Sequence, residues 1–246
     1  MNLSIIKFDF MNNGLKRPVV IVYLFLYPLL IFAILSNITA GLFHIEGLSK
    51  DFYAVTTMIF IQFSLGTMIT NMIMENSVKY SNLRLAYIVP KPFGIIMSKV
   101  LSLVILDVIS VAFYIVVCRW IFGVQFHSME WELGMTYFIC GCLSIALGVV
   151  ILLLLKDESL TNNTFGAIQS ILCLTGGVFF PVSLFGGKFI ALSNLSPARW
   201  ILRELNNALY LRQTLGLNML LLCFFVVSLI MFLLAKFLFR VEHLME

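Results

Sequence analysis

Long apolar runs limit what this 246-residue chain can fold into more than any other feature of its sequence. An α-helix needs about 20 mostly apolar residues to cross the roughly 30 Å of hydrocarbon in a bilayer, and several runs reach that length. Hydrophobic residues make up 61% of the chain and charged residues 11%, whereas soluble domains average about 45–50% and about 25%. The sequence therefore predicts an all-α polytopic membrane protein.

We expect six transmembrane helices within one domain that covers residues 1–246. The expected spans are approximately 18–36, 52–74, 98–122, 132–155, 161–180 and 216–239. The first run is longer than the 7–15-residue core of a signal peptide and has no small-x-small cleavage site, so we expect it to be retained. Before it, Leu3, Ile6 and Phe10 share helical spacing, which predicts an amphipathic helix along the inner membrane interface; a frayed terminus is the alternative.

Six spans place both termini on one side of the membrane. If that side is cytoplasmic, most basic residues lie inside, as the positive-inside rule requires. The inner Lys and Arg are Lys7, Lys16, Arg17, Lys79, Arg84, Lys91, Lys99, Lys156, Lys236 and Arg240. The last outer segment, 181–214, is an exception because it is also basic. The net charge of +4 is scattered over the loops, so we do not expect nucleic-acid binding.

The longest polar interruption in the first two-thirds of the chain runs from Met74 to Lys99, and we call it the 74–99 segment. Two spans could be joined by far fewer residues, so we interpret this segment as a docking element for a cytoplasmic partner. The residues that we expect to take part are Glu75, Lys79, Arg84, Pro90 and Lys99, together with Lys91 and Pro92.

Polar stripes mark the second and fifth expected spans. On the second span, Phe60, Ser64, Thr67 and Asn71 fall on one helical face. On the fifth, one face carries Asn162, Gly166, Gln169, Cys173 and Gly177. Polar groups within a bilayer face protein or water, so these stripes form hydrogen bonds between helices or line a translocation path.

Two further features lie on the third and fourth spans. Asp107 is deep in its span and needs a partner: either it has a functional or interface role, or neighbouring Ser or Tyr hydroxyls satisfy it. Arg119 near the outer end is expected to reach the headgroups. Gly141, Ser144 and Gly148 form a small-residue face that predicts close helix packing.

Residues 181–214 are too broken for a lipid-facing span. Pro181, Gly186, Gly187 and Pro197 interrupt the segment, and an amphipathic stretch with Arg199 and Arg203 follows. We expect an outer helical hairpin that dips into the membrane and is covered by protein.

The sequence contains no pattern typical of catalysis or metal binding. GxxxxGK[ST], HExxH and GxSxG are absent, and His44, His127 and His243 lie outside the expected spans. The five cysteines lie in apolar runs, where they behave as small hydrophobic residues. We therefore expect no catalytic residue, no metal site and no disulfide framework.

The order of these features resembles the ABC-2 type permeases, the membrane subunits of type V ABC exporters. Glu75, Leu83, Pro90 and Lys99 resemble the family's acidic start, apolar middle, Leu-Pro-like end and Lys. Residues 177–181 (GVFFP) and 195–197 (LSP) resemble its fifth-span exit and outer re-entrant hairpin. Where many members have a Gly-Thr step, this chain has residues 79–82, KYSN, a departure that affects the docking register.

The resemblance implies a permease subunit that exports amphipathic peptides, drugs or lipid-like compounds. Two copies, or this chain and a related one, would form the pore in the plasma membrane of a bacterium. Two separate ATP-binding cassette subunits would hydrolyse ATP with Mg²⁺, with no cofactor in this chain. The alternatives are a membrane-embedded substrate-capture component and a lipid-modifying membrane enzyme.

Overall fold

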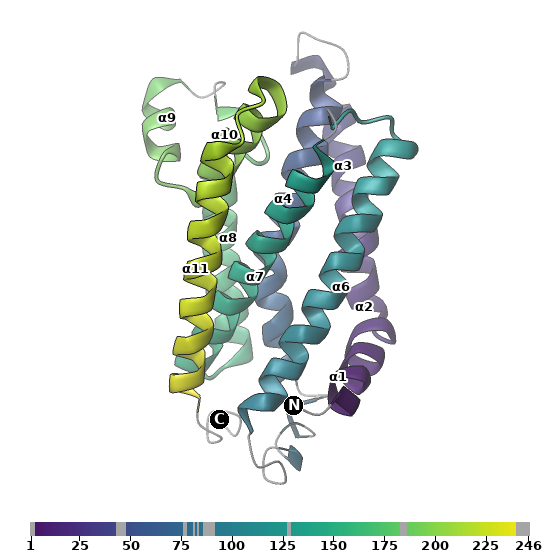
Figure 1. Cartoon of the computed structure of the whole chain (residues 1–246), viewed down its shortest axis with the longest axis vertical. Coiled ribbons are helices and arrows are strands. Elements are labelled where there is room, and N and C mark those ends of the chain that lie inside the picture. Colours follow the sequence, from purple (N-terminus) through teal and green to yellow (C-terminus); the bar gives the residue numbers. More distant parts are fainter. Residues whose placement is uncertain are drawn as a thin grey trace.

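The computed structural model describes residues 3–42, 48–75, 78–80, 82, 84–85, 92–126, 129–182 and 186–239. All regular elements in these residues are helical, and five helices are long and apolar enough to cross a membrane. They are Pro18–Ile38, Ser49–Met74, Phe93–Trp120, Glu130–Leu155 and Leu215–Leu238. The long helices lie side by side in one bundle (Figure 1). The predicted all-α membrane protein is confirmed, with five such helices where six spans were expected.

The first of these helices is continuous but not uniform. It begins as α2 (Pro18–Ile21), widens into the π-helical turn η2 (Val22–Leu26) and continues as α3 (Tyr27–Ile38), which a short 3₁₀ turn, η3 (Ala40–Leu42), follows. Pro18 occupies the first turn, where its missing N–H costs nothing. Pro28 is the second residue of α3, two residues after the π-turn, and such a turn provides room for the proline ring inside a helix.

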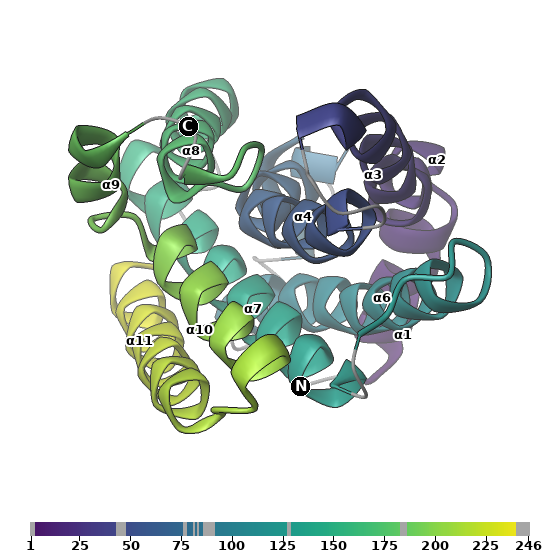
Figure 2. The ribbon, with the colours of Figure 1, turned by 90° about the horizontal axis from the view of Figure 1, so that it is seen from above.

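Helix α4 (Leu48–Met74) is the centre of the bundle. In its most apolar stretch, 83% of the residues are buried. The corresponding share is 28% for Pro18–Ile38 and 22% for α11 (Leu215–Leu238). Seen from above, α4 lies among α3, α6 (Phe93–Trp120), α7 (Glu130–Leu155) and α8 (Glu158–Gly176), whereas α11 lies at the margin (Figure 2). The marginal helices therefore have most of their apolar side chains uncovered by the rest of the described chain.

Small residues bring α7 close to α4. Ser144 Oγ donates to Phe63 O at 2.8 Å and accepts from Gly66 N at 3.0 Å. A Cβ on Gly148 would lie closer than 3.0 Å to the Gly66 backbone, so only glycine fits at this crossing. The predicted small-residue face of Gly141, Ser144 and Gly148 is thereby confirmed as a site of close helix packing.

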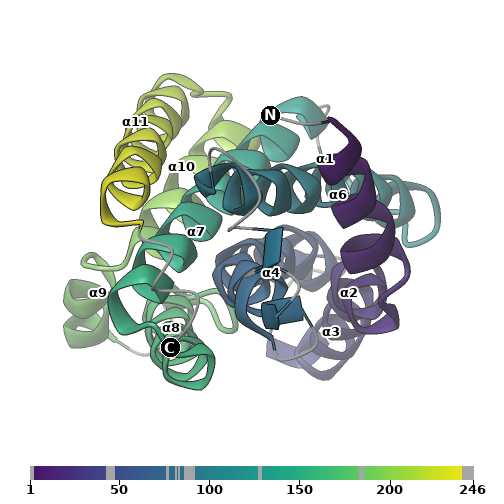
Figure 3. The same ribbon diagram turned by 90° about the horizontal axis from the view of Figure 1, so that it is seen from below.

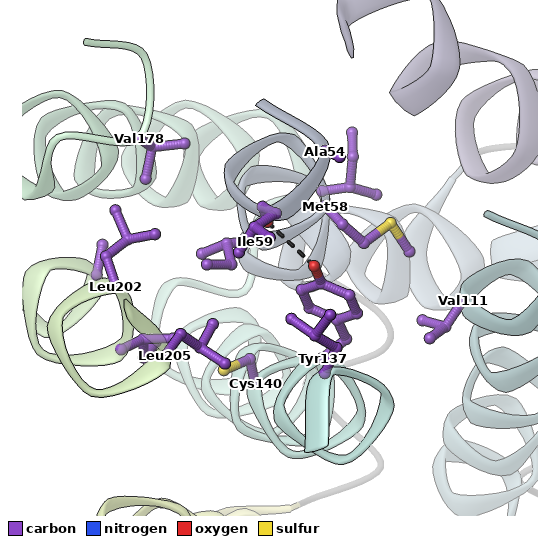
Figure 4. Packing of buried hydrophobic residues seen from close by; sticks show 14 of the residues in the cluster. Ala54, Met58, Ile59, Val111, Tyr137, Cys140, Val178, Leu202 and Leu205 are labelled. Atoms are coloured by element: carbon purple, nitrogen blue, oxygen red, sulfur yellow. Dashed lines mark hydrogen bonds between the residues drawn. The ribbon is translucent and has the colours of Figure 1, made fainter. Parts of the chain in front are cut away.

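The buried apolar residues form two clusters, stacked along the bundle. We call the end at which α10 (Pro197–Leu211) lies the upper end and the end at which α1 (Leu3–Asp9) lies the lower end (Figure 1). The upper cluster includes Met58, Val111 and Leu205, and within it the Tyr137 hydroxyl donates to Val55 O at 3.2 Å (Figure 4). The lower cluster begins at Leu65 on α4.

The N-terminal segment is helical, as predicted. Helix α1 and the π-helical turn η1 (Phe10–Leu15) lie against α6 at the lower end (Figure 3). The side buried against α6 includes Asp9, which is 4% exposed, while Phe8 is 58% exposed. Phe10 of the expected apolar face packs against the lower cluster, and the buried side also carries the carboxylate of Asp9, which the spacing did not predict.

The fifth expected span corresponds to α8, a 19-residue helix that is not among the five apolar candidates. Asp157 caps its start by accepting from Leu160 N at 2.6 Å. Gly177, with φ +84°, ends it, because the left-handed conformation suits glycine. The helix thus stops at Gly176, earlier than the expected residue 180.

Two helices, α9 (Gly187–Ser193) and α10, follow α8 at the upper end. Helix α10 begins at Pro197 and buries Ile201, Leu205 and Ala208 on one side, which confirms the predicted amphipathic helix. The dip of this region into the membrane stays a prediction. The predicted inner tail, 240–246, lies outside the described residues.

Candidate functional site

A polar layer crosses the middle of the bundle, and we define it as Gln62 on α4, Asp107 on α6 and Ser144 on α7. Gln62 Nε2 donates to Asp107 Oδ1 at 2.8 Å, and both side chains are buried. The expectation that Ser or Tyr hydroxyls would satisfy Asp107 is wrong, because the partner is an amide from another helix. The nearby Ser110 hydroxyl donates to the backbone oxygen of Asp107 instead.

The two predicted polar stripes face each other. Asn162 Nδ2 on α8 donates to Asn71 Oδ1 on α4 at 2.5 Å. About two turns higher along α8, Gln169 Nε2 donates to Phe60 O at 3.2 Å. Asn71 and Gln169 therefore form hydrogen bonds between helices, which is the first of the two interpretations of the stripes. Ser64 and Thr67 instead bond to carbonyls of their own helix.

An inner cavity of about 680 Å³ lies between the first span, α4 and the start of α8. Its wall is largely apolar, with Val20, Tyr23 and Met68. Thr67 and Asn71 add polar groups to that wall, so residues of the second-span stripe also line a space. Its charged groups come from the lower ends of the helices, and they are Arg17, Glu75 and Glu158. Such a cavity can hold a ligand with an apolar body and a polar head.

A second, more polar cavity of about 540 Å³ lies between the 74–99 segment and the turn from α7 to α8. Lys79 and Lys156 line it together with Asp157 and Glu158. Burial raises the pKa of the Glu158 carboxyl above its ordinary value; the carboxylates of Glu75 and Asp157 raise it further, whereas Lys79 lowers it. Carboxylates therefore crowd this corner of the lower end.

The described part of the 74–99 segment is amphipathic and helical at 78–80, 82 and 84–85. Val78 and Asn82 are buried, and Asn82 Nδ2 donates to Ile73 O at 2.8 Å, which holds the segment against α4. Arg84 and Tyr80 are exposed on the other side. The predicted docking residue Pro90 lies outside the described residues, as do Leu83 and Lys91.

Two ion pairs attach the N-terminal residues to this lower end. Arg17 pairs with Glu75 at the end of α4, on a partly exposed surface. Lys99 Nζ donates to Asp9 Oδ1 at 3.0 Å, and Ser98 Oγ donates to Asp9 Oδ2 at 2.6 Å. Both side chains of the Lys99 pair are buried. Lys99 therefore cannot touch a docked partner directly. It can affect docking only by holding α1 in place through Asp9.

At the upper end, the predicted residues are spread over several elements. Arg119 pairs with Glu130 at the start of α7, in addition to any headgroup contact. Pro181 follows the end of α8, and Pro197 opens α10. Arg203 Nε donates to Glu204 Oε1 at 3.0 Å, while the buried Nε of Arg199 has no acceptor among the described residues.

The sequence interpretation missed Gln62, Asp9 and Arg17 as site residues. Gln62 lies two residues from Phe60 and so points about 200° away from the polar stripe. A signal was nevertheless present, because an amide in one span is a natural partner for a lone acid in the next. Lys99 could have indicated Asp9, because a lysine near the start of the third expected span needs a carboxylate partner.

These features define a class: a helical, multi-pass membrane protein with a polar layer between its helices and amphipathic cavities at one end. Residues 4–210 match the ABC-2 type transporter family, and the chain therefore belongs to that family. It is accordingly a transmembrane permease of an ABC transporter, and the resemblance noted in the sequence is confirmed. No curated protein and no solved structure gave a match.

Proposed function

We propose that this chain is the permease subunit of an ATP-driven exporter of amphipathic compounds, such as peptides, drugs or lipid-like molecules. The observation that carries the cargo class is the inner cavity, where an apolar wall meets the charged groups Arg17, Glu75 and Glu158. An ion or a sugar would need a dense polar lining instead, whereas an amphipathic molecule suits both parts of this wall.

The 74–99 segment is the proposed docking site for a separate ATP-binding cassette subunit, which supplies ATP hydrolysis with Mg²⁺. Its buried side is held to α4 by Asn82, so movement of the exposed side is passed to the central helix. Arg84 and Lys79 can meet an acidic groove on the partner. Closure of the partner would then bias the helices between inward-facing and outward-facing states.

The proposed topology has six spans, the five apolar helices and α8 as the fifth in chain order, and both termini in the cytoplasm of a bacterial cell. Helix α8 has 19 residues, which is about 28 Å of helix, and Ile168, Ile171 and Leu174 are exposed on it. Two permease chains, identical or related, and two ATP-binding subunits complete the transporter. The basic upper-end segment with Arg199 and Arg203 then faces outward.

A co-purification experiment tests the docking site. The variants Lys79→Glu and Arg84→Glu should lose the ATP-binding subunit and ATP-dependent export, because the charge that faces the partner is reversed. Lys188→Glu is the matched control, since this exposed lysine lies on α9 at the opposite end. Retention of the ATP-binding subunit and of export in the doubly reversed Lys79→Glu/Arg84→Glu chain would contradict the proposed docking site.

A second experiment tests the cargo path separately. Replacing Thr67 with Leu makes the wall of the inner cavity less polar without touching the docking segment. The expected result is unchanged co-purification of the ATP-binding subunit, with an altered order of export rates across a series of amphipathic compounds. An unchanged order of rates would remove the inner cavity from the path and leave the docking proposal standing.

A further inference from the structure

The polar layer leaves one buried atom unsatisfied. Gln62 uses Nε2 to donate to Asp107 Oδ1, but no described group donates to its own Oε1, which is buried. A Cβ on Gly141 would collide with Gln62 Oε1 and would lie 3.0 Å from Asp107 Oδ2. Both oxygens therefore pack against the same glycine of α7, and a buried acceptor without a donor is costly.

The position of Asp107 excludes easy access of water. It lies near the middle of α6, about 20 Å along the helix from either end. On α4, α6 and α7 the upper apolar cluster ends and the lower one begins at this level. An ionised carboxylate here would be desolvated from both sides, which is very costly without a cation or several donors.

Among the described residues, no cation is placed to neutralise Asp107. The stretches 18–38, 52–74 and 133–155 contain no Asp, Glu, Lys, Arg or His. On α6 itself, Lys99 lies about 12 Å away along the helix and is paired with Asp9, and Arg119 is farther. Lys7 on α1 and Lys16, directly after η1, are exposed at the lower end.

The other titratable neighbours are neutral groups. The thiols of Cys140 and Cys142 on α7 are close enough to interact electrostatically with Asp107. The hydroxyls of Tyr114 and Tyr137 donate to backbone carbonyls of α4. Tyr23 on the first span lies near Ser64. None of these groups supplies a positive charge.

We propose that Asp107 is an intramembrane proton-binding site and that it forms a neutral acid–amide pair with Gln62. The protonated carboxyl donates from Oδ2 to Gln62 Oε1, while Oδ1 accepts from Gln62 Nε2. This arrangement satisfies both polar atoms of the amide and removes the charge from the middle of the bundle. It also explains the glycine at position 141, because any side chain there would separate the pair from α7.

Infrared spectroscopy of the purified full chain in lipid nanodiscs at neutral pH tests this site. The carbonyl stretch of a protonated carboxylic acid is separate from that of a carboxylate, and ¹³C-aspartate labelling assigns it to aspartate. We expect such a band in the wild type and its loss in Asp107→Asn. Asp157→Asn is the control, because that side chain caps α8 at the lower end and Asn can also cap. An unchanged spectrum in Asp107→Asn would overturn the proposal.

A second variant keeps the test valid if Asp107→Asn does not fold. Gln62→Leu removes both hydrogen bonds to the acid but leaves the acid itself in place. The protonated-aspartate band should persist and move to higher frequency, because its hydrogen bonds are lost. A band that is absent, or that stays at the wild-type frequency, would show that Asp107 is not paired with Gln62 as an acid.

Discussion

At the scale of single residues, the buried pair of Asp9 and Lys99 shows how a charge becomes stable inside the protein. Lys99 is 2% exposed, and its charge is offset by one carboxylate, which Ser98 also binds. Because burial costs both ions their hydration, the pair itself adds little to stability, but each partner depends strongly on the other.

We therefore expect Lys99→Met to lower the free energy of unfolding by about 3–5 kcal/mol, because Asp9 is left buried without its cation. The double variant Asp9→Asn/Lys99→Met should recover much of that loss, since no charge remains unpaired. Equilibrium unfolding in detergent for the two single variants and the double variant gives the coupling between them. Additive effects of the two substitutions would contradict this interpretation of the pair.

Glu158 provides a prediction about pH. Its pKa in the folded protein is raised above the ordinary value of 4.5, so the folded state holds this proton more tightly than the unfolded state. Its contribution to stability is thus greatest below that ordinary value and is lost as the pH rises through the raised value.

Glu158→Gln removes the ionisation and should raise the thermal midpoint at about pH 8 relative to the wild type, with no gain at about pH 4. Thermal unfolding followed across this range is the measurement. A gain of equal size at both pH values would mean that the carboxylate charge is not the cause.

At the scale of elements, the crossing of α4 and α7 depends on the absence of side chains. Gly148→Ala places a methyl group against the Gly66 backbone, which cannot move like the end of a side chain. We expect a loss of about 1–3 kcal/mol in stability, the usual cost of overpacking.

Gly166→Ala is the matched control for this substitution. It lies inside α8, and a Cβ there would meet nothing within 4 Å. Alanine favours helix over glycine by up to about 1 kcal/mol, so this variant should be neutral or slightly more stable. Equal losses in the two variants, measured by the same unfolding assay, would show that the close crossing is not what requires glycine.

At the scale of the whole molecule, the proposed topology predicts opposite accessibility for the two ends of α8. Cysteine at position 157 should react with a membrane-impermeant maleimide only after cells are opened, whereas cysteine at 188 should react in intact cells. The native cysteines, all of which lie within helices, are first replaced so that only the introduced cysteine can react. Labelling of both positions in intact cells would contradict a membrane-crossing α8, and the reverse pattern would invert the orientation.

Much of this architecture was predictable because the long helices follow from length and apolarity alone. The small-residue face of α7 and the stripes of α4 and α8 were predictable from helical periodicity. Their pairing was not, because nothing in the sequence says that Asn71 faces Asn162. The same holds for Asp107 and Gln62, 45 residues apart, since the partner lies off the stripe that periodicity identified.

The neutral middle of the bundle has a consequence for how the protein responds to voltage. Moving one elementary charge across a membrane potential changes the energy by about 2.3 kcal/mol per 100 mV. With Asp107 protonated, the central stretches of the helices carry no formal charge. A shift of α4 against α6 therefore moves no charge through the electric field of the membrane. Its conformational equilibrium would then depend on ATP and cargo, while the electrical state of the cell has little influence.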